Sequence, residues 1–172
     1  MQIRKANQED IREIMSMIKV TVKLMEKNQN DQWSSEYPHE EDFQTDLHKG
    51  DLFVATLQEN VVGCITIDQE EPDEYSFVKW RKEGEAYLFH RLAVDPDIRG
   101  EGIASKLITF AESLAIKNHV FYMKVDTYSL NQQAQQLFEK LGYEKRGEIY
   151  LFGKNEPFYC YDKILQKPIK QG

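Results

Sequence analysis

The sequence is poor in cysteine and has no long hydrophobic run. Its two cysteines, Cys64 and Cys160, both lie in short apolar stretches typical of strands. Free cysteine is readily buried, so we expect reduced core thiols rather than a disulfide or a metal site. No apolar stretch approaches the ~20 residues that span a bilayer, and the start MQIRKANQED lacks the apolar region of a signal peptide. A cytoplasmic protein with no membrane or metal partner is the expectation.

Acidic residues outnumber basic ones, with 29 Asp and Glu against 22 Lys and Arg. The formal net charge of −7 at pH 7 disfavours nucleic acid, because phosphates would be repelled without a dense basic patch. It suits a cationic substrate. With 172 residues, 41% of them hydrophobic, the chain can bury one core but hardly two. Because no linker, repeat or low-complexity stretch is present, we expect a single domain over residues 1–172.

Hydrophobic spacing and turn residues predict alternating strands and helices. The N-cap residues Asn7 and Asn131 and the glycines Gly50 and Gly142 mark helix ends. The expected elements are a strand at 2–6, a helix after Asn7, a loop at 28–36, a helix from Pro38 to Gly50, a hairpin through Gln58 to Asn60, a polar segment from Gln69 to Gly84, a strand at 86–94, a helix from Ile103 to Lys117, a strand at 120–127, a helix from Asn131 to Gly142, and strands at about 143–152 and 157–164.

One stretch, LAVDPDIRGEGIASKLITFAESLA, is the most informative of the chain. A strand ends at Val94, a turn with Gly100 and Gly102 follows, and an amphipathic helix starts at Ile103. A strand end, a glycine turn and a helix N-terminus together offer unpaired backbone N–H groups and the positive end of the helix dipole. Glycine also has no side chain to keep a phosphate away. The stretch therefore predicts a ligand that carries phosphates.

Two other phosphate-binding motifs fit this turn less well. The GxxxxGK[ST] loop is excluded, because no lysine and hydroxyl pair follows Gly102. The dinucleotide fold is closer, since Gly100, Gly102 and Ser105 nearly spell GxGxxG and Asp126 ends the next strand. However, five residues separate Val94 from the first glycine, and the third glycine is missing. Too little chain follows Asp126 for the second half of a doubly wound sheet.

The turn and the segment after it resemble the GNAT N-acetyltransferase superfamily. Arg99, Gly102 and Ala104 fit its Arg/Gln-x-x-Gly-x-Gly/Ala pattern, LAVDP precedes them, and TYSLNQQAQQLFEKLGYEKRGE resembles its second hallmark, with Asn131 and LGYE. The resemblance covers nearly the whole chain. It implies an α/β (α+β) fold with a mixed central sheet of about seven strands, flanked by about four helices, in which two parallel central strands splay apart.

The resemblance also implies acetyl-CoA as the cosubstrate. In this superfamily the pantetheine arm pairs with the central strand, and the glycine turn holds the pyrophosphate. Read as structure alone, Asn131 is a helix N-cap and Arg99 a solvated surface charge. The residues that the resemblance places at acetyl-CoA are Leu92, Ala93, Val94, Arg99, Gly100, Glu101, Gly102, Ile103, Ala104, Ser105 and Asn131.

An amine acceptor needs a base, because an amine with a lysine-like pKa of ~10.4 is mostly protonated at neutral pH. His90 lies on the expected central strand, where alternation would place its side chain on the face of Leu92 and Val94. Certain arylalkylamine acetyltransferases of the superfamily are similar in carrying a histidine here. We predict that His90 is the catalytic base, directly or through water. Glu85 and Tyr87 are alternatives, and a hydrogen-bonded core histidine is the structural interpretation.

One departure concerns the general acid. Many members carry a tyrosine in LYEKLGF that protonates the leaving CoA thiolate, whereas this chain reads LFEKLGY and has Phe138 there. Water, Tyr128 or Tyr161 could replace that tyrosine. The departure also keeps open a catalytically inactive CoA-binding module.

Large aromatic side chains occur in two segments that are otherwise polar. Such rings either anchor a loop on the core or line a binding site. In the superfamily the segment between the first two helices borders the acceptor pocket, so we expect Trp33→Ala to raise the acceptor KM with little loss of stability. Nearby acidic residues, Asp31, Glu36 and Glu40, favour a cationic amine. The residues expected to contact the acceptor are Trp33, Tyr37, Trp80 and Tyr128.

Together these features favour an acetyl-CoA-dependent N-acetyltransferase that acts on the primary amine of a small metabolite by direct attack in a ternary complex. Transfer to a protein terminus or lysine is the alternative. Dimerisation is common in the superfamily, so a homodimer is a further expectation, although no dimer surface can be identified from the residues.

Overall fold

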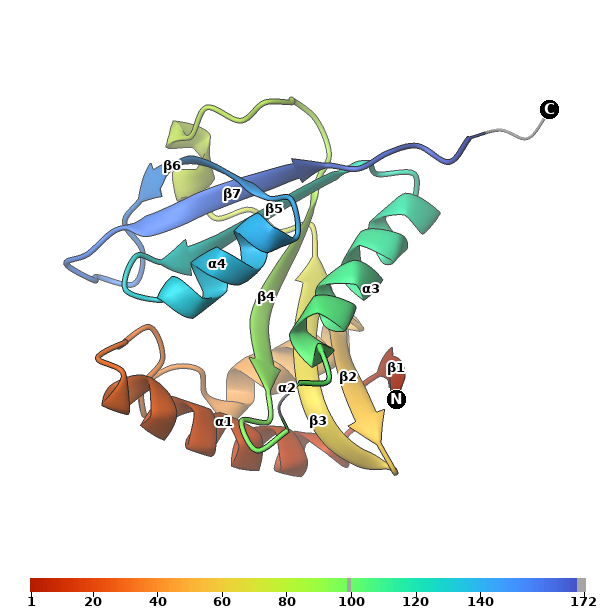
Figure 1. Cartoon of the computed structure of the whole chain (residues 1–172), viewed down its shortest axis with the longest axis vertical. Coiled ribbons are helices and arrows are strands. Elements are labelled where there is room, and N and C mark those ends of the chain that lie inside the picture. The colour runs from red at the N-terminus through yellow and green to blue at the C-terminus, as the bar shows by residue number, and fades with distance from the viewer. Residues whose placement is uncertain (99, 170–172) are drawn as a thin grey trace. The chain divides into compact units, whose positions relative to one another are not determined.

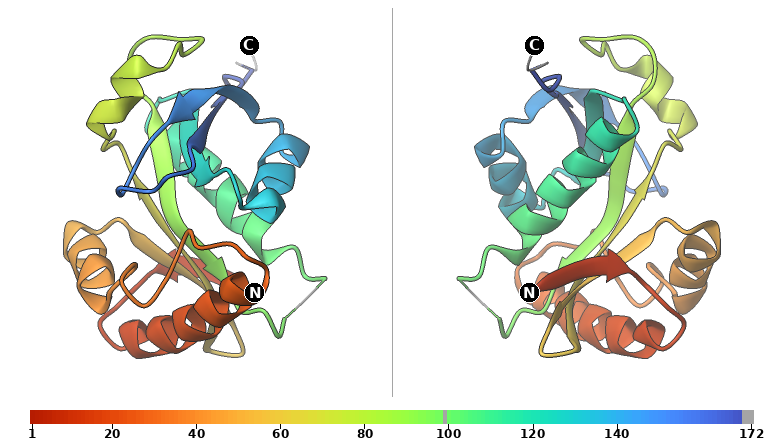
Figure 2. Two further views of the ribbon diagram at one scale, coloured as in Figure 1. Left: turned by 90° about the vertical axis from the view of Figure 1, so that its left-hand side faces the viewer. Right: turned by 90° about the vertical axis from the view of Figure 1, so that its right-hand side faces the viewer.

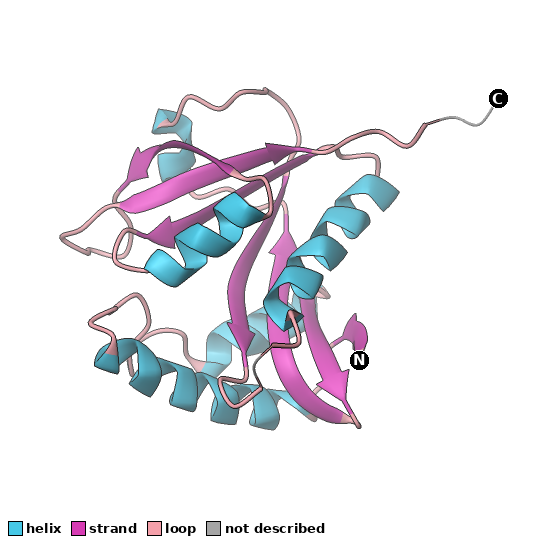
Figure 3. Ribbon diagram, viewed as in Figure 1, coloured by secondary structure: helices cyan, strands magenta, loops and turns pink. Residues whose placement is uncertain are grey.

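The computed structural model describes residues 1–98 and 100–169. Figures 1 and 3 show its helices and strands. In chain order they are β1 (Gln2–Lys5), α1 (Asp10–Lys27), α2 (Glu40–Lys49), β2 (Leu52–Leu57), β3 (Asn60–Asp68), the 3-10 helix η1 (Asp73–Phe77), β4 (Tyr87–Val94), α3 (Ile103–Lys117), β5 (Tyr122–Tyr128), α4 (Gln132–Lys140), β6 (Glu144–Ile149) and β7 (Phe158–Ile164). None of the described helices combines the length and apolar character that crossing a membrane requires.

The strands are ordered β1-β2-β3-β4-β5-β7-β6 in one sheet. The pairs β1–β2, β2–β3, β5–β7 and β6–β7 are antiparallel, and β4–β5 is parallel. The parallel pair is in register at Tyr87 with Met123 and at Leu88 with Lys124, at the start of β4. The expected α/β fold with a mixed sheet of about seven strands and about four helices is confirmed.

The chain groups into two compact units. The first comprises Met1–Asp68 and Phe89–Phe110, and the second comprises Gln69–Leu88 and Ala111–Gly172. Along the chain, β4 and α3 each run from one unit into the other. A single domain over residues 1–172 stays a prediction.

In the first unit, a tight hairpin joins β2 to β3. Leu57 pairs with Asn60, and the two residues between them, Gln58 and Glu59, have φ values of 47° and 69°. Positive φ at both central positions is the geometry of a turn that matches the right-handed twist of the strands. The predicted hairpin through Gln58 to Asn60 is confirmed.

The sheet of the first unit has helices on both faces, as Figure 2 shows. The apolar stripe of α1, including Ile14 and Ile18, packs with Phe43 of α2 in one core cluster. The start of α3 packs closely against β3 on the other face. A Cβ at Gly63 would lie 3.0 Å from Leu107 and 3.1 Å from Ile103. The lack of a side chain at Gly63 therefore lets α3 approach the sheet at the point where the predicted phosphate site begins.

In the second unit, β7 separates two packing layers because its side chains alternate. Tyr161 faces α4, where its ring lies 5.7 Å from Phe138. Its neighbour Asp162 accepts instead from Arg81, with 2.8 Å between Nε and Oδ1. The predicted polar segment from Gln69 to Gly84 is therefore bonded to the sheet through Arg81, and it contains the short helix η1.

The predicted helix ends are mostly confirmed. The Asn131 side chain accepts from the Ala134 N–H at 3.1 Å, and Gly50 ends α2 with φ of 76°. The predicted start of the second helix at Pro38 is wrong by two residues, since α2 begins at Glu40. His39, the N-cap residue, is still extended, and its N–H donates to the Asp42 carboxylate at 2.7 Å, so the backbone N–H of the cap is satisfied.

Candidate functional site

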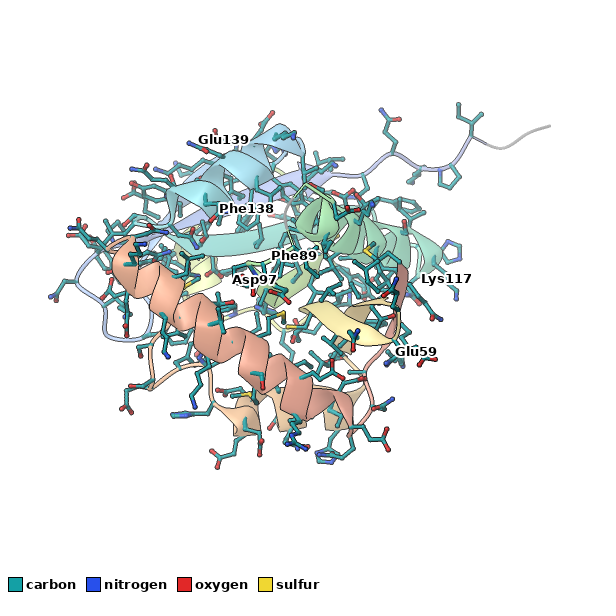
Figure 4. All side chains as sticks on the ribbon, turned by 60° about the horizontal axis from the view of Figure 1, so that its bottom comes forward. Glu59, Phe89, Asp97, Lys117, Phe138 and Glu139 are labelled. Atoms are coloured by element: carbon teal, nitrogen blue, oxygen red, sulfur yellow. The ribbon has the colours of Figure 1, made fainter. Side chains whose placement is uncertain are left out.

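The loop after β4 is held as a turn in the first unit. The Asp95 N–H donates to the Val62 carbonyl at 2.9 Å, which ties the loop to β3. The Asp95 side chain accepts from the Asp97 N–H at 2.9 Å, and its carbonyl accepts from the Ile98 N–H at 3.1 Å. Figure 4 labels Asp97 in this loop. The chain is thus turned locally before it reaches the glycines.

Both glycines of the loop have left-handed backbone. Their φ values are 78° at Gly100 and 63° at Gly102, and a Cβ at either position would meet nothing within 4 Å. Helix α3 starts immediately afterwards, and its first residue, Ile103, is buried. A first helical turn presents N–H groups without intrahelical acceptors, at the positive end of the dipole. The predicted strand, glycine turn and helix are therefore present, with open space beside the glycines.

The other residues predicted at acetyl-CoA lie around this loop or in the second unit. Glu101 is exposed, Ala93 is buried, and half-buried positions are Leu92, Val94, Ala104 and Ser105. Arg99 lies outside the described residues. Asn131, in the second unit, is the N-cap of α4. Contact of each of these residues with acetyl-CoA stays a prediction.

His90 forms a close pair with Asp68, the last residue of β3. His90 Nε2 lies 2.9 Å from Asp68 Oδ1, and the two side chains are 21% and 10% exposed. A carboxylate can only accept, so Nε2 carries the proton of this bond. In the neutral ring, Nδ1 is then the nitrogen with a lone pair that can take a proton. Sequence reasoning missed Asp68, although it ends the alternating strand VVGCITID beside the central strand.

Arg91 interrupts the regular alternation of β4. Its φ is 46°, in the left-handed region that side chains other than glycine seldom adopt. The expectation that His90 shares a face with Leu92 and Val94 assumed a regular strand, and the left-handed residue removes its basis.

The Arg91 side chain is clamped by α2 and by the loop before it. Its Nε and Nη2 donate to the two carboxylate oxygens of Asp46 at 2.6 and 2.7 Å. Its Nη1 donates to the Tyr37 hydroxyl at 2.8 Å, and the Thr66 hydroxyl donates to Asp46 at 2.7 Å. Burial alone would lower the pKa of Arg91, but its hydrogen bonds to Asp46 raise that pKa above its ordinary value. Burial raises the pKa of Tyr37, and Arg91 opposes that shift.

Trp33 belongs to the core of the first unit. Its side chain is 5% exposed and lies in the cluster that includes Ile14 and Phe43. The expectation that Trp33→Ala would spare stability is therefore wrong, because polar neighbours in sequence concealed a core position. Contact of the ring with an acceptor stays a prediction.

We expect Trp33→Ala to lower the free energy of unfolding by about 3–5 kcal/mol, because it removes a buried indole and leaves a cavity. Urea denaturation measures the change. Trp33→Phe, which keeps an aromatic ring in the same space, is expected to lose much less. Equal stability of Trp33→Ala and the wild type would show that the core does not depend on this ring.

Two other predicted acceptor residues lie in the second unit. Trp80 Nε1 donates to the Tyr75 carbonyl at 2.9 Å, and Lys124 Nζ lies 4.5 Å above its ring. Tyr128 is buried, with its ring 5.0 Å from that of Phe158. Both rings therefore take part in the packing of the unit, and their contact with an acceptor stays a prediction.

Phe138, at the position where the resemblance leads us to expect a tyrosine, is buried on α4 beside Glu139 (Figure 4). Its ring packs on Tyr143 and Tyr161, at 6.2 and 5.7 Å. Burial raises the pKa of Tyr161 to about 12, so this hydroxyl keeps its proton at neutral pH. Replacement of the missing acid by Tyr161, Tyr128 or water stays a prediction.

Comparison with known proteins agrees with this arrangement. A family model described as the acetyltransferase (GNAT) family matches residues 18–143. The chain is 22% identical over 143 residues to the uncharacterized N-acetyltransferase YesJ of Bacillus subtilis, a match that spans 81% of this chain and 79% of YesJ. It is also similar to the crystal structure of a GNAT family acetyltransferase from Streptococcus agalactiae, with a TM-score of 0.83, 26% identity and 96% of each chain covered. A GNAT family acetyltransferase from Listeria monocytogenes shares the fold, with a TM-score of 0.74, 22% identity and 95% and 94% of the two chains covered.

Proposed function

The chain belongs to the acetyltransferase (GNAT) family, and on that premise we propose that it transfers the acetyl group of acetyl-CoA to the primary amine of a small metabolite. The observation that carries the proposal is the loop between β4 and α3. Its two left-handed glycines leave open space beside the N-terminus of α3, where backbone N–H groups can hold a pyrophosphate. These residues fit the phosphates of acetyl-CoA, whose thioester supplies an activated acetyl group when it is bound.

His90 would remove the proton that the attacking amine must lose. Asp68 holds Nε2–H, so Nδ1 is the nitrogen that accepts the proton, directly or through one water. The Asp68 carboxylate also stabilises the imidazolium that results. In a direct transfer the amine nitrogen forms its bond to the acetyl carbon, the bond between that carbon and sulfur breaks, and the thiolate leaves with the electron pair.

The acceptor class follows from charge. The formal net charge of −7 favours the approach of a cation. In the first unit, Glu36 and Glu40 are exposed and lie within three residues of the half-buried Tyr37 in the sequence. Carboxylates beside an aromatic ring attract an ammonium group, which must then lose a proton to become a nucleophile.

Product analysis tests this function. The wild-type protein is incubated with acetyl-CoA carrying a deuterated acetyl group and with a panel of small amines and amino acids, pre-selected by thermal shift in the presence of CoA. A small molecule heavier by the labelled acetyl group is the expected product. A labelled peptide or protein with no labelled small molecule would replace the proposal with protein acetylation, and bound CoA without turnover would leave only a binding module.

A further inference from the structure

The left-handed residue in the middle of β4, Arg91, lies three residues before the end of the strand, where the loop of the proposed site begins. Leu92, Ala93 and Val94 follow Arg91 directly and carry the backbone groups proposed for the acetyl-CoA arm. A single left-handed residue in a strand redirects every peptide group after it. Should Arg91 relax to an extended conformation, the N–H and C=O groups of the next residues would change sides. The orientation of this backbone therefore depends on one strained torsion angle.

A φ of 46° is unfavourable for any residue with a Cβ, so contacts elsewhere in the structure must stabilise this conformation of Arg91. The contacts that do so are made by its guanidinium group. Its contacts to Asp46 and Tyr37 come from α2 and the preceding loop, so β4 is pinned at Arg91 to elements distant in sequence. The guanidinium side chain is 17% exposed and that of Asp46 is 7% exposed. Water therefore competes little for these bonds, and the planar fork matches the carboxylate.

We propose that Arg91 is a positioning residue of the acetyl-CoA site. Clamped by Asp46 and Tyr37, it keeps the left-handed turn of β4 that aims the backbone of Leu92 to Val94. The inference rests on the proposed function. It gives Arg91 a role in the site although its guanidinium would touch neither the acetyl group nor the amine. It also explains why a charged residue occupies a left-handed position where glycine would be free of strain.

Arg91→Lys tests the clamp, because lysine keeps the charge but cannot make the two parallel bonds to Asp46. We expect kcat/KM for acetyl-CoA to fall about tenfold or more, since small misplacements at a reacting site are costly. The KM of acetyl-CoA should rise more than the KM of the acceptor. Tyr37→Phe removes only the hydroxyl bonded to Arg91. It should also lower kcat/KM for acetyl-CoA and raise the KM of acetyl-CoA, but by less than Arg91→Lys.

Arg4→Lys is a matched control. The Arg4 guanidinium also makes two bonds to a buried carboxylate, with Nη1 and Nη2 at 2.7 and 3.0 Å from Asp10. Both Arg→Lys variants should lower the melting temperature, but only Arg91→Lys should change acetyl-CoA kinetics. Urea titration of each variant measures the fraction that is folded under assay conditions. If Arg91→Lys does not fold, the kinetics of Tyr37→Phe are used to test the inference instead.

Three results decide the inference. Unchanged acetyl-CoA constants in folded Arg91→Lys, or in Tyr37→Phe when that variant is the one that folds, would overturn it. Equal kinetic losses in Arg4→Lys and Arg91→Lys would overturn it too, because the effect would then be general destabilisation. A wild-type protein that neither binds CoA nor transfers acetyl groups would instead overturn the proposed function, and this is measured before any variant.

Discussion

Replacing His90 with Gln should lower kcat about tenfold or more at neutral pH, because glutamine keeps polarity but cannot take the proton of the amine. The pH profile of the rate should differ between His90→Gln and the wild type, because glutamine cannot act as a base at any pH. The variant should keep its affinity for CoA. Steady-state rates over a pH series, together with a CoA titration, measure both effects.

His48→Gln is the control for His90, since His48 is exposed on α2. Its rate and pH profile should match the wild type. Asp68→Asn should also reduce kcat, because the amide oxygen can accept the Nε2–H bond but lacks the negative charge that stabilises the imidazolium. A His90→Gln variant with the wild-type rate and wild-type pH dependence would make His90 a core residue that only packs beside Asp68.

Gly102→Val should weaken CoA binding about tenfold or more, equivalent to ~1.4 kcal/mol or more of binding free energy. The new side chain would occupy the open space beside the helix N-terminus that the proposal gives to the pyrophosphate. It also forces a branched residue into φ of 63°, which is strained. A calorimetric titration of each variant with CoA measures the change.

Gly153→Val separates the two effects of that substitution. Gly153 has φ of 65°, and a Cβ there also meets nothing within 4 Å. The two variants should therefore carry similar backbone strain, while only Gly102→Val loses affinity. CoA affinity in Gly102→Val equal to that in Gly153→Val would move the pyrophosphate away from this loop.

Much of the local structure could be predicted because it depends on residues close in sequence. The α3 bounds of Ile103 and Lys117, the Asn131 cap and the hairpin at Gln58 follow from periodicity and turn chemistry. The family could be identified because the residues of its pattern, a glycine turn and the helix after it, are contiguous in sequence, and the expected fold followed from that resemblance.

Long-range side-chain pairing could not be predicted in this way. Asp68 and Asp46 lie 22 and 45 residues from His90 and Arg91, and one sequence holds no record of which carboxylate meets which cation. The burial of Trp33 was hidden because its neighbours are polar. The left-handed torsion of Arg91 had no local signal either, since arginine is not a residue that favours it.

The proposed acetyl transfer requires first of all that this chain binds CoA. Isothermal titration of the wild-type protein, treated with a chelator and then given CoA, tests it directly. We expect saturable binding of CoA at one site per chain with no metal added, and no binding of NAD. Binding of NAD without affinity for CoA would contradict the account and restore a dinucleotide site at the glycine turn.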